Sequence, residues 1–362
     1  MSTRFVNVEE RSVSGHVISW AGDCPWTNSI CFGTNEGCLI ILPDLLPEAS
    51  LNSGAINAIA FSGDLVTLSS PSEVTLCKRI SEEPLLLQKL AHSFEGGAHS
   101  IVAAAPGVFL ATLGDDGVLC LSVDAKGNVT ARVARQASGS EYYYKIVPFI
   151  DRPGREVFLC AARHDGILVI TTENGIPRPP VTCFRFGEQD IIDVCPLNHP
   201  DYPYAVTCLS RSCGLFIVPD VFSTEFPYEV RFADIRGTAY SLAAAQDHLF
   251  LLTSEAFFCL PRVISRMLKQ APLNSIPSPV LPMSASEMYL LGDHSIVLLA
   301  DGGAKLMTVA ELVGETLADG PAVVSSGNRQ VSMEIPNRQL TRSRFQWQNS
   351  TLDLTLDDPL LV

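Results

Sequence analysis

Short apolar runs separated by small or acidic residues recur along most of the chain. The recurring unit is an apolar strand, a second apolar strand, a tight turn and a third strand, and its clearest copies are VFLATLGDDGVLCL and EVFLCAARHDGILVI. The two copies align without gaps from Phe109 and Phe158, so that Asp116 of one turn coincides with Asp165 of the other. Asp-Gly supplies the positive φ that a tight hairpin requires, and Val, Ile, Leu and Phe favour strands. The pattern therefore predicts repeated β-hairpins.

Five weaker copies of the unit occupy the rest of the apolar sequence. Their turns fall at residues 35–37, 71–73, 212–214, 254–255 and 301–303. Successive turns are about 36 to 49 residues apart, close to the spacing of four-stranded propeller blades. One such sheet cannot bury both of its faces, whereas a ring of stacked sheets buries each face against its neighbour. We therefore expect an all-β fold, a single seven-bladed β-propeller, with six or eight blades left open because the sixth unit is hard to delimit.

A helical insertion interrupts the repeat at residues 261–270. Apolar residues at positions 263, 264, 267 and 268 have helical spacing, and Pro261 suits a first helical position. The cations Arg262, Arg266 and Lys269 then share the exposed side. Residues 310–317 are expected to form another short helix.

The C-terminal residues are more polar and lack the repeat. We divide the chain into a propeller domain, residues 1–317, and a tail, residues 318–362, with strands expected at 330–335 and 343–348. Because propellers often close their ring with a terminal strand, we expect either this tail or the opening RFVNVEE to complete the last blade. Docking of the tail to a partner is the alternative.

Composition narrows the class of protein. Hydrophobic residues make up 47% of the 362 positions and charged residues only 18%, which suits a large core of buried strands. A net charge of -14 repels nucleic-acid phosphates and anionic lipid, so neither is expected as a partner. No apolar run is long enough to cross a membrane, no signal-peptide core follows the N-terminus, and the eleven cysteines suit a reducing compartment. We expect a cytoplasmic protein.

The cadence of the units resembles that of the WD-repeat-like propeller superfamily. The segments SGHVISWAGD, INAIAFSGDLVTLSS, TLGDDGVLCL and ARHDGILVI carry the resemblance over about residues 10–310. No unit is bracketed by Gly-His and Trp-Asp, and the tryptophans are Trp20, Trp26 and Trp347 only, so the hydrogen-bonded network of regular WD repeats is not carried over. The resemblance implies an assembly platform that binds proteins on its faces.

Motifs for metals, cofactors and nucleophiles are weak or missing. Cys208 and Cys213 are five positions apart but no Cys-x-x-Cys occurs, so buried thiols are expected in place of zinc. Asp115, Asp116 and Asp301 have the chemistry that hairpin turns require, and no Asp-x-Asp-x-Asp loop suggests calcium. The sequence contains no Gly-x-Ser-x-Gly and no phosphate-binding glycine loop. We expect no cofactor and no metal.

The polar cluster Arg163, His164 and Asp165 falls at one hairpin. Adjacent residues of a strand point to opposite faces, so His164 and Asp165 do not form a catalytic dyad by spacing alone. A turn aspartate beside a surface histidine is the simpler interpretation. The alternative is a turn that lines a cavity in which the histidine titrates.

Two segments are candidates for partner binding. Tyr142, Tyr143 and Tyr144 are consecutive, so at least one must face away from the others in a strand, and tyrosine is frequent at the centres of interfaces. Packing between blades is the alternative for the tyrosines. The second candidate is the basic helix with Arg262, Arg266 and Lys269, which suits an acidic partner, and capping of a cavity on one face is its alternative.

We therefore expect a non-enzymatic scaffold or adaptor within a larger protein complex. The alternative is a propeller hydrolase, lyase or lactonase that acts on a small molecule in the axial funnel. Polar side chains that converge in the funnel would favour the enzyme, and an apolar plug would exclude it.

Overall fold

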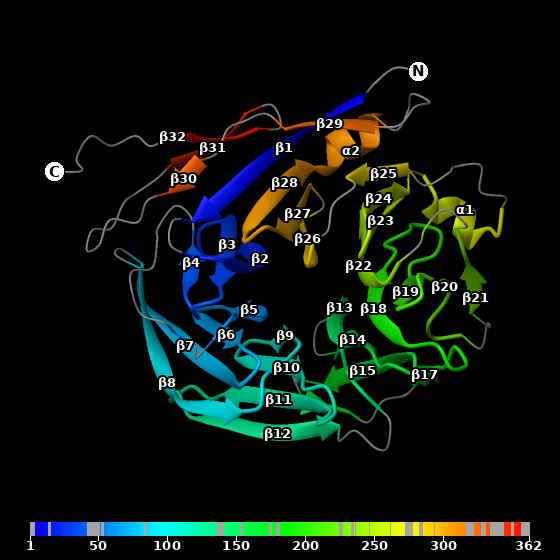
Figure 1. Cartoon of the computed structure of the whole chain (residues 1–362). Coiled ribbons are helices and arrows are strands. Elements are labelled where there is room, and N and C mark those ends of the chain that lie inside the picture. Colours follow the sequence, from blue (N-terminus) through cyan, green and yellow to red (C-terminus); the bar gives the residue numbers. More distant parts are fainter. Residues whose placement is uncertain are drawn as a thin grey trace.

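The chain forms a ring of seven small β-sheets around a central axis, as the computed structural model shows (Figure 1). This confirms the predicted seven-bladed β-propeller. The structure describes residues 4–355 except 14–15, 42–50, 52–53, 83–84, 136–140, 153–154, 174–175, 179–181, 224–226, 233–234, 236, 246, 261, 272–277, 282–284, 293, 316–321, 327–330, 334–343 and 349–350.

Each blade is an antiparallel sheet whose strands follow one another outward from the axis. Blade 1 contains β2 (Ile18–Cys24), β3 (Ser29–Thr34) and β4 (Leu39–Ile41); blade 2 contains β5 (Ala58–Ser62), β6 (Leu65–Ser69), β7 (Glu73–Glu82) and β8 (Leu85–Glu95); blade 3 contains β9 (Ser100–Ala105), β10 (Val108–Thr112), β11 (Val118–Val123) and β12 (Val129–Arg135). Blade 4 contains β13 (Lys145–Arg152), β14 (Arg155–Ala161), β15 (Ile167–Glu173), β16 (Ile176–Pro177) and β17 (Thr182–Phe184).

The last three blades repeat this order. Blade 5 contains β18 (Ile191–Pro196), β19 (Val206–Ser210), β20 (Leu215–Val218) and β21 (Tyr228–Val230); blade 6 contains β22 (Ala239–Ala245), β23 (His248–Thr253), β24 (Phe257–Leu260) and β25 (Ser278–Leu281). Blade 7 contains β26 (Glu287–Leu291), β27 (Ser295–Ala300), β28 (Gly303–Thr308) and β1 (Arg4–Val13).

The opening strand closes the ring. β1 pairs antiparallel with β28, with Glu10 opposite Lys305, and so becomes the fourth strand of the last blade. Two strands that follow the propeller, β29 (Ala322–Ser326) and β30 (Val331–Met333), pair with β1 in parallel. A separate hairpin consists of β31 (Arg344–Gln348) and β32 (Thr351–Thr355). Of the two segments considered for closure, the N-terminal one completes the blade, and the division of the chain at residue 317 stays a prediction.

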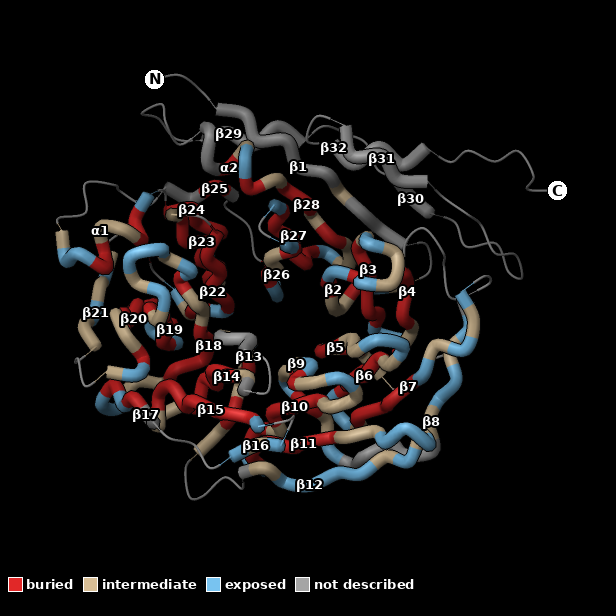
Figure 2. The backbone as a smooth tube through the Cα atoms, turned by 180° about the vertical axis from the view of Figure 1, so that it is seen from behind, coloured by how far each residue is buried: buried red, intermediate tan, exposed pale blue. Residues whose placement is uncertain are grey.

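The core is divided among the interfaces between blades. Seven clusters of buried apolar side chains are present in the described residues, and each joins two neighbouring blades, including blade 7 to blade 1. The small residues Ala104 and Ala243 lie in the inner strands β9 and β22, as expected where blades crowd near the axis. Figure 2 shows that second strands such as β19 and β23 are buried and that the outer strand β12 is exposed.

Both predicted helices are present but differ in their bounds. α1 covers the five residues Ile264–Leu268, within the predicted 261–270, and α2 covers Val309–Glu315, where 310–317 was predicted. Pro261, the expected first helical position, lies outside the described residues. In the part of the chain that is described, no helix has the length and apolar character needed to cross a membrane.

The order of the strands defines two faces. Because the strands of a blade alternate in direction, the turns between second and third strands lie on the same side as the segments that lead into each first strand. We call this side the turn face. The helix α1 follows a third strand, β24, and so lies on the opposite face. There the backbone N–H of Ser265 donates to Asp247 Oδ1, and Ser265 Oγ lies 3.0 Å from His199 Nε2.

Candidate functional site: the axial channel and its rim

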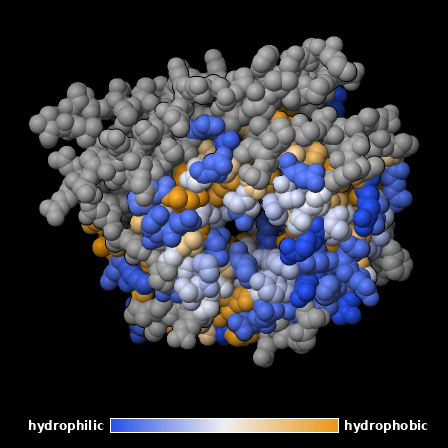
Figure 3. All heavy atoms as spheres, viewed as in Figure 1, coloured by the Kyte–Doolittle hydropathy of each residue, from blue (hydrophilic) through white to orange (hydrophobic). Residues whose placement is uncertain are grey.

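A cavity of about 650 Å³ follows the axis of the ring. It is lined by residues from the first strands of the blades or from the segments that lead into them, and Figure 3 shows a hollow near the centre of the visible face with hydrophilic residues around it. The lining is mixed: Trp20, Tyr289 and Ile146 are among its apolar members, and Lys145 and Glu287 among its charged ones. The described lining of the channel is therefore not an apolar plug.

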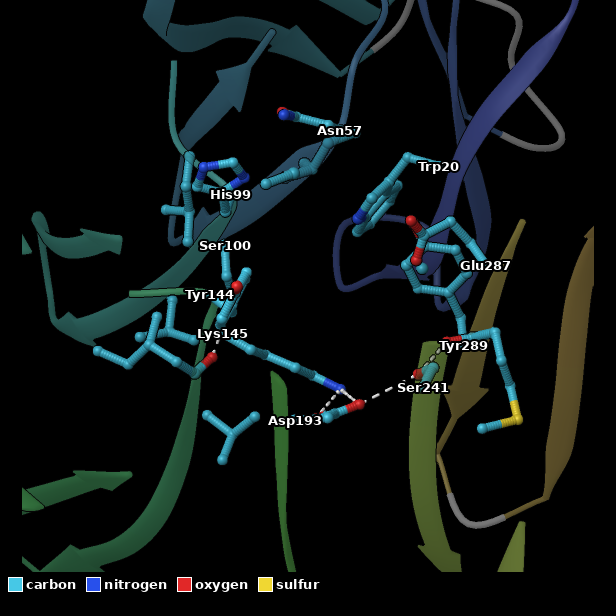
Figure 4. Close-up of a pocket in the computed structure, with 18 of the residues that line it drawn as sticks. Trp20, Asn57, His99, Ser100, Tyr144, Lys145, Asp193, Ser241, Glu287 and Tyr289 are labelled. Carbon is cyan, nitrogen blue, oxygen red and sulfur yellow. Dashed lines mark hydrogen bonds and ion pairs between the residues drawn. The ribbon is translucent and has the colours of Figure 1, made fainter. Parts of the chain in front are cut away.

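An ion pair with one buried partner, Asp193, joins three blades across one part of the channel (Figure 4). Lys145 Nζ of blade 4 lies 2.7 Å from Asp193 Oδ1 of blade 5, whose side chain is only 2% exposed. Asp193 Oδ2 accepts hydrogen bonds from Ser241 Oγ at 3.2 Å and from the backbone N–H of Leu242 at 2.8 Å, both in blade 6. The backbone N–H of Val194 donates to Asp193 Oδ1 at 2.7 Å.

The charge states in this network follow from its partners. Burial acts to lower the pKa of Lys145, but the charge of Asp193 and the hydrogen bond to it outweigh burial, and the pKa is raised. Lys145 is therefore a cation at neutral pH and Asp193 is its counter-ion. Both carboxylate oxygens of Asp193 are already occupied by donors, so this carboxylate is not available as a general base.

Local irregularities in the first strands place these side chains. The register of β18 on β19 shifts between Ile191 and Asp193, and the register of β22 on β23 shifts between Ala239 and Ser241. Such bulges redirect the side chains that follow them and are frequent next to functional sites. The same shift precedes Trp20 in β2.

A second group of channel residues lies apart from the ion pair in Figure 4. Trp20 and Tyr289 meet edge to face, with ring centroids 5.8 Å apart and an angle of 62° between the rings. Glu287, two residues before Tyr289 in β26, lines the same cavity. Burial raises the pKa of Glu287, although the charge of Lys145 opposes the effect.

Polar and aromatic side chains cover the rim of the channel on the turn face. Tyr142 Oη lies 2.6 Å from His99 Nε2, and the rings of Tyr142 and Tyr144 are 4.6 Å apart. Arg211 donates from Nη2 to Tyr144 Oη at 3.1 Å, and its guanidinium lies over the Tyr144 ring. The Nε–H of Arg211 donates to Asp190 Oδ2 at 2.8 Å. We call these five side chains, His99, Tyr142, Tyr144, Asp190 and Arg211, the rim patch. His99 and Tyr144 also line the channel, so the patch and the cavity are continuous.

Backbone hydrogen bonds to neighbouring blades hold the tyrosine segment in place. Tyr143 donates from its N–H to Gly114 O of blade 3, and Tyr144 donates from its N–H to Ala161 O of blade 4. A carbon atom at the Cβ position of Gly114 would lie 2.9 Å from both His99 and Tyr142, and its φ is 62°, so glycine is required beneath the patch.

The structure places the three consecutive tyrosines differently. Tyr143 is fully buried and packs in the core between blades 3 and 4, so it is left out of the contact surface, whereas Tyr142 and Tyr144 are half-buried on the turn face. The predicted turn cluster lies on this face as well: Asp165 forms an ion pair with Arg185 at 2.9 Å. The basic helix residues Arg262, Arg266 and Lys269 lie on the opposite face. The two predicted partner sites are therefore separated.

Arg163 combines a strained backbone with an unsatisfied side chain. Its φ is 43°, in the left-handed region, and its Nε is buried without a hydrogen-bond partner among the described residues. Within the same part of the chain, His164 Nδ1 and Asp190 Oδ1 are also buried without partners. Strain and unpaired polar atoms gather at functional sites more often than elsewhere. The turn of blade 4 therefore borders the rim patch as a second unusual feature of this face.

The ten cysteines whose side chains the structure describes are free, and most of them are buried. Cys208 is inaccessible to solvent, and Cys213 donates from its thiol to Gly237 O. In the same residues, no three His, Cys, Asp or Glu side chains lie close enough together to hold a metal ion.

The channel residues Lys145, Asp193, Ser241 and Glu287 are not among the site residues predicted from the sequence, although a signal for three of them exists. Lys145, Asp193 and Ser241 are separated by 48 residues in each step, which is the repeat length of these blades. Polar residues that recur at the blade period occupy equivalent places around the axis, so a search at that period would have grouped them.

Comparisons with known proteins agree on the fold. No protein-family model and no curated protein matches the sequence. Among solved structures, the chain is similar to YCF48 from Cyanidioschyzon merolae, with a TM-score of 0.58, 11% identity, and coverage of 84% of this chain and 99% of that one. It is also similar to U3-55K, with a TM-score of 0.59, 10% identity, and coverage of 85% of this chain and 100% of that one. At such identities these likenesses show that the chain is a β-propeller, and its kinship with the WD-repeat-like superfamily stays a prediction.

Proposed function

We propose that this propeller is a non-enzymatic scaffold that binds a protein partner on its turn face, over the mouth of the channel. The observation that carries the proposal is the rim patch, where Tyr142, Tyr144 and Arg211 stack on one another. Tyrosine and arginine are the residues that contribute most often to the centres of protein interfaces. The alternation of positive and negative groups in the patch also suits a protein surface better than a nucleic acid.

The rigidity of the patch supports the same function. Its side chains are held by neighbouring blades through the hydrogen bonds described above, so little conformational entropy is lost when a partner binds. The expectation of protein partners, and of a cytoplasmic location, stays a prediction at this point.

A small-molecule hydrolase, lyase or lactonase is the second candidate, because polar groups do converge in the axial cavity. The arrangement within the cavity favours it less. Asp193 is saturated with donors and Lys145 is neutralised by it, so Glu287 is the remaining carboxylate among the described residues that line the cavity. A single carboxylate without an adjacent nucleophile or base provides a binding group rather than a complete catalytic arrangement.

Affinity purification of the tagged chain from its native host, followed by mass spectrometry, tests the proposal. We expect a partner at near-stoichiometric level whose recovery is lost when Tyr142 and Tyr144 are both replaced by Ala. Loss of one hot-spot side chain, as in Arg211→Ala, costs at least about 2 kcal/mol, or roughly 30-fold in Kd.

The matched control is the variant with Arg262→Ala and Lys269→Ala, which removes two exposed cations from the opposite face. Partner recovery should be unchanged in this variant. If recovery is lost only in the helix variant, the interface lies on the opposite face and the proposal is wrong. A chain that is folded and has no stoichiometric partner would also overturn it and would favour the enzyme.

A further inference from the structure

The corner formed by Trp20, Tyr289 and Glu287 has chemistry that the rim patch does not share. Trp20 comes from blade 1, and Tyr289 and Glu287 come from blade 7, whose first strand contacts that of blade 1. The two rings stand at 62° to each other, and Figure 4 shows Glu287 beside them. Two aromatic walls and one carboxylate thus border the same part of the cavity.

The indole of Trp20 is fixed in place by the backbone beneath it. A carbon atom at the Cβ position of Gly22 would lie 2.0 Å from the Cη2 atom of Trp20, so the ring lies directly against this glycine. Any side chain at this position would push the indole away. The aromatic corner is therefore formed before a ligand arrives, which reduces the entropy that binding must overcome.

The charges that line the cavity do not balance. Lys145 and Asp193 neutralise each other at 2.7 Å, and His99 is neutral because desolvation lowers its pKa despite the charge of Asp115. Among the described residues, no hydrogen bond or ion pair is made by the carboxylate of Glu287, and Lys145, whose charge acts on this carboxylate, is itself paired with Asp193. The described lining thus has one carboxylate in excess of its cations, and this side chain is exposed to the cavity.

We propose that the axial channel binds an organic cation, a guanidinium or ammonium group, between Glu287 and the rings of Trp20 and Tyr289. Cations are attracted to the faces of Trp and Tyr, and a partly desolvated carboxylate adds a charge-assisted hydrogen bond. The arginine or lysine side chain of a protein partner and a free small amine share this chemistry. The inference goes beyond the proposed function, because it assigns a ligand class to the channel whether or not a protein delivers it.

Titration of the purified chain with two guanidinium probes, agmatine and N-acetyl-arginine-N-methylamide, tests the inference by calorimetry and by tryptophan fluorescence. We expect saturable binding, and no binding of the neutral citrulline analogue of the second probe. Glu287→Gln should weaken binding at least about tenfold, and Glu188→Gln, an exposed glutamate of the same chemistry, should leave it unchanged. Tyr289→Phe should retain affinity and Tyr289→Leu should lower it, because the ring and not the hydroxyl faces the cation.

The key variant is expected to fold well. Because the pKa of Glu287 is raised in the folded state, ionisation of this carboxyl costs stability at neutral pH, and Glu287→Gln should be slightly more stable there. The difference should disappear at a pH low enough to protonate the carboxyl in both folded and unfolded chains. Thermal denaturation of this variant beside the unsubstituted chain separates a loss of binding from a loss of folding.

Tighter binding of the peptide-like probe identifies a side chain as the source of the cation, and tighter binding of agmatine identifies a free amine. Absence of saturable binding of either probe up to about 10 mM, or equal binding by Glu287→Gln, would overturn the inference. Because these measurements contain no protein partner, they can fail while partner recovery on the turn face succeeds, and the reverse.

Discussion

At the scale of single residues, Arg163 is the clearest departure from what a propeller turn requires. Its counterpart in blade 3, by the alignment of the two turns, is Gly114, and both have positive φ, 43° and 62°. Glycine adopts this conformation freely, whereas a residue with a Cβ adopts it at a cost of about 1–2 kcal/mol. Blade 4 therefore keeps an arginine at a place that favours glycine, beside the rim patch.

Replacing Arg163 with Gly should raise the free energy of unfolding by about 0.5–1 kcal/mol, because the strain is relieved. Urea denaturation measures this change. Asp301→Gly is the matched comparison: its φ is 55°, but aspartate tolerates the left-handed region better than arginine, so its gain should be smaller. A loss of stability in the Arg163 variant would mean that the guanidinium makes contacts worth more than the strain.

At the scale of elements, the pair of Lys145 and Asp193 ties the first strands of blades 4, 5 and 6 together. Lys145→Ala leaves a buried carboxylate with its three hydrogen-bond donors but without its counter-ion. We expect the free energy of unfolding to fall by about 2 kcal/mol, less than the 3–5 kcal/mol of a fully buried pair because the lysine is 34% exposed. Thermal denaturation at neutral pH measures the loss.

Arg178→Ala provides the control, since its ion pair with Glu173 is exposed on both sides and should contribute less than about 1 kcal/mol. Equal effects of the two substitutions would show that the channel ion pair contributes no more to the free energy of unfolding than an exposed ion pair does. The pH dependence has a definite sign: the raised pKa of Lys145 means that its contribution is present below the pKa of an unfolded lysine and is lost as pH rises through the folded value.

The sequence predicted the elements better than the site for physical reasons. Turns such as Asp116-Gly117 can be predicted from the sequence because a tight hairpin requires a positive φ, which glycine adopts freely. The apolar runs on either side of such turns indicate buried strands. Outer strands such as β12 are exposed and carry no such pattern. The site was not predictable in this way, because Asp193 and Lys145 lie 48 positions apart and form their ion pair only when the folded ring brings blades 4 and 5 together.

At the scale of the whole molecule, stability depends on closing the ring with β1. Deletion of residues 1–13 should expose the edge of β28 and leave blade 7 with three of its four strands. We expect a lower thermal midpoint and concentration-dependent association, because an unpaired edge strand recruits other chains. Differential scanning calorimetry and sedimentation velocity measure the two effects.

Lys305→Gln is the control for this deletion, because it removes the ion pair with Glu10 while the strand pairing remains. Its thermal midpoint should change little. If the deletion leaves a monomer with an unchanged midpoint, ring closure by β1 is dispensable, and the strands that follow the propeller are sufficient to complete the blade.

Closure of the ring by the first strand also determines how long that strand waits for its partner during synthesis. β1 precedes all the other strands in the chain, while its antiparallel partner β28 is made after the other six blades. At about 5–20 residues per second, the strand is unpaired for roughly 15 to 60 seconds of translation. Its charged residues Arg4, Glu9, Glu10 and Arg11 oppose pairing with neighbouring nascent chains during that interval. Completion of this ring therefore waits until β28 has been synthesised, and β1 has no antiparallel partner of its own blade before then.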